Sequence, residues 1–215
     1  MQTLSISEQF FLLAMTTRGT LSSMNEYAKP ALLMASLLDL NNAGVIVLEK
    51  KKFRVVKEQV PAELAHLEGF YNRISHLRTK SLSMLGASSF EKELKGIVSS
   101  IREQKVEQGL IQTSVAQGFL QKEKVEYQAK ESVIEELIET LKLEMQKPQP
   151  SMKMIALAIL SQKARITNKY LSLQEQAELK KVLKQFRKSD VSKQTQRMFD
   201  DIDTMFVIIA ATIIS

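Results

Sequence analysis

The side chains most able to do chemistry are two histidines and a group of aspartates, and neither set has the spacing of a known site. His66 and His76 fall in what the pattern predicts to be one helix, with no carboxylate at metal-ligand spacing, so we expect ordinary surface or half-buried histidines. Asp200, Asp201 and Asp203 lack the glycine and the distal glutamate of a calcium loop. Helix capping explains the aspartates better, with Asp203 at the start of the last helix.

Cysteine and glycine usage excludes further kinds of chemistry. The chain has no cysteine, which rules out disulfides, thiolate catalysis and cysteine-bound metals. Its 7 glycines are scattered and form no phosphate-binding loop, and no serine, histidine and aspartate are spaced as a catalytic triad. We therefore expect no enzyme and no cofactor.

Basic residues point instead to an anionic partner. The chain carries 30 basic and 24 acidic residues, a net charge of +6. Two basic runs stand out, each explained most simply as a solvated turn or an exposed helix face. The first run holds Lys50, Lys51, Lys52, Arg54 and Lys57 around a hairpin tip, and the second holds Lys180, Lys181, Lys184, Arg187 and Lys188 on a helix.

The elements that position these residues begin with residues 4–56, which predict helix, turn, helix, glycine and β-hairpin. Ser5 and Glu8 have the spacing of a capping box, and Ile6, Phe10 and Leu13 follow at helical spacing. A second helix ends near Asn42, before Gly44. The strands of the first hairpin are predicted at residues 45–48 and 53–56.

The remaining chain is predicted to be helical apart from a second hairpin. A helix after Pro61 leads to a serine-rich break at residues 81–89, and a helix capped by Ser89 ends at Gly109. The arms of the second hairpin are predicted at residues 118–120 and 124–127, after a short strand at 110–113. The helices that follow are predicted near residues 133–147, 152–160, 173–186 and 205–214.

These elements predict a mostly α fold, a single globular helical domain over residues 1–215 with two peripheral β-hairpins. The helix at 152–160 is very apolar and the helix at 205–214 is apolar all round, and both are expected at its centre. The longest apolar run, 205–214, is about half the length that spans a bilayer, and no signal peptide is visible. We expect a cytoplasmic protein, or one bound peripherally to a membrane.

Five segments, in order and with little change in spacing, resemble the Golgi phosphoprotein 3 family. They lie at residues 4–15, 37–48, 106–111, 155–160 and 207–212. The resemblance implies a non-catalytic peripheral membrane protein that binds phosphatidylinositol 4-phosphate. Eukaryotic members act on the cytosolic Golgi face as adaptors for protein clients. The absence of the basic N-terminal arm of those members, and of cysteine, favours a bacterial-type member.

The resemblance also places a lipid-headgroup pocket on this chain. Met24 stands where the family has a tryptophan, Leu33 where it has an arginine, and Lys95 and Val98 where it has two more arginines. Only Lys95 keeps a positive charge, so general attraction to anionic lipid is expected to outweigh headgroup specificity. Lys29 and Arg102 are further basic residues that the resemblance does not place. The resemblance also implies oligomerisation and membrane contact through the second hairpin. Residues 121–124 of this chain are polar where the family has an apolar stretch.

Two other classes of function stay open on the sequence. Helix, helix and basic hairpin are the order of a winged helix–turn–helix, but residues 31–40 are apolar except for Ser36 and Asp39. A recognition helix needs basic or polar side chains for the major groove, so nucleic acid is not an expected partner. The second alternative is a cytosolic scaffold that binds a protein client and no lipid.

Overall fold

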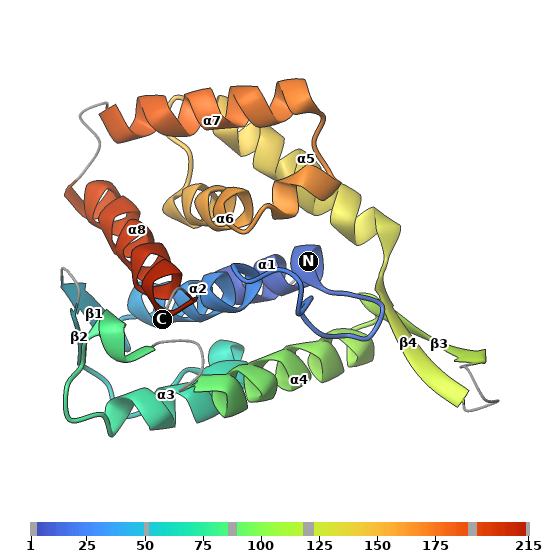
Figure 1. Ribbon diagram of the computed structural model, residues 1–215, viewed down its shortest axis with the longest axis horizontal. Helices are drawn as coiled ribbons and strands as arrows, with labels where there is room; N and C mark the ends of the chain where they lie inside the picture. Colours follow the sequence, from blue (N-terminus) through green and yellow to red (C-terminus); the bar gives the residue numbers. More distant parts are fainter. Residues whose placement is uncertain (1–3, 50–51, 86–89, 118–122, 189–192, 214–215) are drawn as a thin grey trace.

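The fold is built in three helical layers around the first two helices (Figure 1). The computed structural model describes residues 4–49, 52–85, 90–117, 123–188 and 193–213. The helices are α1 (Ile6–Ala14), α2 (Ala28–Asn42), α3 (Glu68–Ser75), α4 (Glu91–Glu107), α5 (Glu131–Gln146), α6 (Met152–Lys163), α7 (Leu173–Lys188) and α8 (Lys193–Ile213). Helices α3 and α4 lie on one side of α1 and α2, and α5 and α6 lie on the other, with α7 outside α6 and α8 against α2 and α6. The mostly α fold class is confirmed.

Two antiparallel hairpins lie at opposite ends of the molecule in Figure 1. One pairs β1 (Ile46–Glu49) with β2 (Lys52–Val55), and the other pairs β3 (Ile111–Gln117) with β4 (Glu123–Ala129). Both hairpins follow a glycine in the left-handed region, Gly44 at φ +66° and Gly109 at φ +68°. A residue without Cβ adopts this conformation at little cost, which explains why the preceding helices end there.

Helix α1 begins with the predicted capping box. The Ser5 backbone N–H donates to a Glu8 carboxylate oxygen at 2.6 Å, and Ser5 Oγ accepts from the Glu8 N–H at 3.2 Å. The Asp39 carboxylate also accepts from the Ile6 and Ser7 N–H groups, each at 2.8 Å. Helix α2 therefore supplies a second cap to α1, which the sequence pattern did not reveal.

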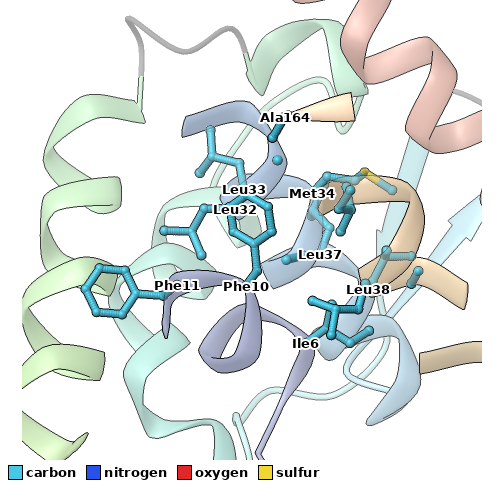
Figure 2. Packing of buried hydrophobic residues seen from close by; sticks show 14 of the residues in the cluster. Ile6, Phe10, Phe11, Leu32, Leu33, Met34, Leu37, Leu38 and Ala164 are labelled. Atoms are coloured by element: carbon cyan, nitrogen blue, oxygen red, sulfur yellow. The ribbon is translucent and has the colours of Figure 1, made fainter. Parts of the chain in front are cut away.

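Helix α2 is buried on every side. Residues 30–40 are all buried, in contact with α1, α4, α6 and α8. Figure 2 shows Leu32, Leu33 and Leu37 packed among Phe10 of α1 and other apolar side chains. No face of residues 31–40 is free to enter a nucleic-acid groove, which removes the recognition helix that a winged-helix protein needs.

The predicted core helix at 152–160 is confirmed as α6, whose residues 154–161 are all buried. The last helix differs from the prediction, because α8 already begins at Lys193 and Asp203 lies inside it rather than at its cap. The prediction that every face of the last helix is buried is also wrong, since Met205 is buried but Val207 is 68% exposed.

Three smaller predictions also need correction or lie outside the described ranges. The helix predicted after Pro61 is a 3₁₀ helix, η1 (Ala62–Leu67), followed by α3, with Leu64 in a non-helical conformation. The first arm of the second hairpin is β3 at 111–117, whereas the predicted arm at 118–120 falls outside the described residues. Ser89 also falls outside them, and the residue before α4 is Phe90.

Candidate anion-binding site

Three cations from two helices line one surface hollow of about 240 Å³. Lys29 comes from the first turn of α2, and Lys95 and Arg102 come from α4. Along α4 the lining residues recur every three or four positions, so they share one helix face. The full lining is Thr20, Leu21, Ser23, Lys29, Leu94, Lys95, Val98, Ser99 and Arg102.

Arg102 is the least exposed of the three cations and is held in place from two sides. Its guanidinium lies 3.4 Å from the Gly19 carbonyl oxygen and 3.5 Å from Ser99 Oγ. Its other neighbour is Tyr127 of β4, whose ring centroid lies 4.9 Å away. Stacking on an aromatic ring orients a guanidinium and leaves donors free for an anion.

Gly19 makes this arrangement possible. A Cβ added there would come within 2.6 Å of Arg102 Cδ and 2.8 Å of Tyr127 Cδ2, and the backbone has φ +66°. The Tyr127 N–H also donates to the Thr17 carbonyl at 2.9 Å. The second hairpin is thereby joined to the loop that lines the hollow.

Lys29 and Lys95 share an acidic neighbour, Glu91. Glu91 Oε1 lies 3.3 Å from Lys95 Nζ and 4.0 Å from Lys29 Nζ, and all three side chains are substantially exposed. Arg102 has a similar contact with Glu103 at 3.6 Å. Exposed ion pairs are worth about 0–1 kcal/mol, so a phosphate with several negative oxygens can displace these carboxylates.

The four residues placed by resemblance separate in the structure. Lys95 and Val98 line the hollow. Met24 does not line it but follows Ser23, which does, and its side chain is 93% exposed. Leu33 is fully buried in the core (Figure 2), so it cannot contact a headgroup. The resemblance did not place three residues of this region, Lys29, Arg102 and Tyr127. Helical spacing from Lys95 through Ser99 could have indicated Arg102.

The two basic runs are less free than the sequence suggested. Lys57 donates to the Ala43 carbonyl at 2.8 Å, and Arg187 pairs with Asp203 at 2.7 Å. Lys180, Lys181 and Lys184 are exposed on α7. Lys50 and Lys51 lie outside the described residues.

The aspartates and histidines that the sequence singled out contact other parts of the fold and form no metal site among the described residues. Asp203 also lies 2.6 Å from Lys163, so it joins α8 to α6 by an ion pair. His76 is exposed, in agreement with the predicted surface or half-buried position. The same prediction is wrong for His66, which is buried in η1. In the described ranges no three His, Cys, Asp or Glu side chains are grouped to hold a metal.

Ser7, His66 and Asp39 do meet in the core, but not in the order of a catalytic triad. Ser7 Oγ lies 2.6 Å from Asp39 Oδ2 and 2.9 Å from His66 Nε2. The serine proton is directed to the aspartate, so His66 donates to Ser7 rather than accepting from it. A triad needs the opposite, with histidine taking the serine proton.

A protein-family model for Golgi phosphoprotein 3 (GPP34) matches residues 6–202. The chain belongs to this family. A search of curated proteins finds no match. Every residue that lines the hollow, and Tyr127 beside it, lies within the range matched to the Golgi phosphoprotein 3 family. Across the described ranges no helix combines the length and apolar character needed to cross a membrane.

Proposed function

We propose that this Golgi phosphoprotein 3 family member is a non-catalytic peripheral membrane or adaptor protein that binds a phosphorylated lipid headgroup. The observation that carries the proposal is the convergence of Lys29, Lys95 and Arg102 on one hollow. A phosphomonoester carries close to two negative charges and accepts several charge-assisted hydrogen bonds, which these side chains can donate. Phosphatidylinositol 4-phosphate is the headgroup that the resemblance implies.

Met24 supports attachment at the bilayer surface. It is a large apolar side chain, 93% exposed, on the loop that also supplies Thr20 and Ser23 to the hollow. Such a side chain gains free energy when it leaves water for the acyl boundary of a membrane. The headgroup would then enter the hollow while Met24 contacts the lipid beside it.

The test is sedimentation with vesicles that are neutral, generally anionic, or doped with phosphatidylinositol 4-phosphate at matched total charge. We expect tighter binding to the doped vesicles, weakened about fivefold by Lys95→Ala or Lys29→Ala, since a lysine near an anionic surface contributes about 1 kcal/mol. Lys92→Ala is the matched control, because Lys92 is exposed on α4 and does not line the hollow.

The outcomes separate the remaining classes of function. Equal weakening by all three substitutions would mean binding by net charge alone and would contradict a headgroup site. Absence of binding even at low salt would overturn the lipid proposal and favour a scaffold for a protein client.

A further inference from the structure

A second cavity, of about 300 Å³, lies between α2, β1, α6 and α8. Its wall is part apolar and part polar: Leu38, Ala156 and Met198 contribute to the apolar side, and the polar groups come from Asn41, Asn42, Arg197 and Asp201. Lys29 and Asn41 stand near opposite ends of α2, about 18 Å apart at the rise of an α-helix. The cavity is therefore separate from the anion-binding hollow.

Asp201 is the unusual group in this cavity. The residue is only 4% exposed, yet its carboxylate has no hydrogen bond or ion pair with any described residue. Buried carboxylates are normally paired, because removing an unpaired charge from water is costly. Burial, reinforced by neighbouring Asp200, raises the pKa of Asp201 to about 6 against the attraction of Arg197.

No neighbouring side chain among the described residues donates to this carboxylate. Asn41 accepts from the Leu48 N–H through its Oδ1 at 3.0 Å, and its amide nitrogen forms no hydrogen bond with Asp201. Arg197 lines the same cavity but is exposed and forms no ion pair with Asp201. The other acidic groups on this part of α8 are engaged elsewhere, Asp203 with Lys163 and Asp200 with Arg187.

A carboxylate only accepts hydrogen bonds, so its natural complement is a cation that carries N–H donors. The apolar wall adds a requirement for hydrocarbon next to that cation. A metal ion would satisfy the charge but not the apolar wall, and the site offers it a single carboxylate. We propose that this cavity binds a small primary alkylammonium ion, with the ammonium at Asp201 and the chain against Leu38, Ala156 and Met198.

The test is a titration of the full chain at pH 7.5 with pentylammonium and with pentanol, a neutral molecule of similar size, followed by amide chemical shifts. We expect saturable shifts at residues that line the cavity and affinity about tenfold higher for the cation, a difference of about 1.4 kcal/mol. In Asp201→Asn the two affinities should agree within about twofold, because the paired charge is gone.

Two further variants keep the test decisive. Asp200→Asn removes the same charge from the adjacent exposed residue and should leave the preference for the cation unchanged. Val47→Phe fills the cavity from β1, a position where an aromatic residue suits the strand, and should abolish binding of both probes with Asp201 intact.

Three results would overturn the proposal: no saturable binding, equal affinity for the two probes, or a preference that survives Asp201→Asn. The inference stands apart from the lipid proposal. Asp201→Asn should leave vesicle binding unchanged, and Lys95→Ala should leave pentylammonium binding unchanged.

Discussion

At the scale of single residues, His66 is a buried imidazole kept neutral by its surroundings. Its Nε2 donates to Ser7 Oγ at 2.9 Å, and its Nδ1 has no hydrogen-bond partner among the described residues. Burial lowers the pKa of His66 to about 4, with Glu8 opposing and Lys105 reinforcing the shift. A protonated imidazole would place a second cation next to Lys105 in the core.

This residue predicts acid sensitivity. The unfolded chain binds a proton at His66 near pH 6.5, whereas the folded chain does so only near pH 4. Between these values the unfolded state holds more protons, so stability is full above about pH 6.5 and falls toward pH 4. We expect His66→Gln, which keeps an N–H donor for Ser7, to remove about 2 kcal/mol of the stability lost by the wild type between pH 7.5 and 4.5.

Urea unfolding at both pH values measures this difference. Asp201, whose pKa burial raises to about 6, titrates in the same range, so the comparison is between the pH profiles of the two proteins. His76→Gln is the control, because His76 is exposed and its replacement should leave the profile of the wild type. Parallel profiles for His66→Gln and the wild type would show that the imidazole does not carry the effect.

At the scale of elements, a buried ion pair joins α1 to α4. Lys105 Nζ lies 2.5 Å from Glu8 Oε1, and both side chains are almost fully buried. Burial alone would raise the pKa of Glu8, but the hydrogen bonds from Lys105 and from the Ser5 N–H leave it lowered. The same carboxylate therefore caps α1 and fixes the position of α4, which carries Lys95 and Arg102.

Removing one partner of this pair should be much worse than removing both charges. Lys105→Met leaves Glu8 buried and unpaired, and we expect a loss of about 3–5 kcal/mol in the free energy of unfolding. Glu8→Gln with Lys105→Met keeps an acceptor for the Ser5 N–H and should recover most of that loss. Urea denaturation of the single and double variants measures both. A double variant less stable than Lys105→Met would show that the pair itself, rather than the orphaned charge, dominates.

The ends of helices that are set by neighbouring residues could be predicted from the sequence. The ends that depend on tertiary packing were harder to predict. The Ser5 and Glu8 capping box and the turn at Gly44 are written in neighbouring residues, and both are confirmed. The start of α8 was missed because the polar residues before Asp203 masked a periodic apolar stripe. That stripe consists of Met198, Phe199, Ile202, Met205 and Phe206, all buried.

The candidate site shows the same limit over longer distances. Lys95, Ser99 and Arg102 share a helix face that spacing predicts. Lys29 reaches the hollow, and Tyr127 reaches Arg102 beside it, from other segments, through tertiary packing that one sequence does not encode locally. Leu33 fails as a site residue for a related reason, since α2 is covered on all sides by helices distant in sequence.

At the scale of the whole molecule, its basic surfaces face different directions. Helix α7, with exposed Lys180, Lys181 and Lys184, lies on the far side of the α1 and α2 layer from α4 (Figure 1). We expect a flat membrane that contacts the hollow on α4 to lie away from α7. Attraction to a membrane should therefore depend on where a charge lies and not on the sum of charges.

Replacing Lys180, Lys181 and Lys184 with glutamine tests this. The three substitutions lower the net charge from +6 to +3 and keep good helix formers on α7. We expect binding to vesicles doped with phosphatidylinositol 4-phosphate to change by less than about twofold, while Lys95→Ala alone weakens it about fivefold. Sedimentation at low and physiological salt measures both proteins. A larger loss from the triple variant would place the membrane contact on α7.

Helix α2 connects the two candidate sites, and the burial of its residues 30–40 has a consequence for how the sites communicate. Its amide protons reach water only when whole layers of the molecule separate, so their exchange requires an opening close in free energy to global unfolding. A helix held this firmly does not bend when one end is occupied. We therefore expect binding in the hollow at Lys29 and binding in the cavity at Asp201 to be thermodynamically additive, with α2 as a rigid spacer between them.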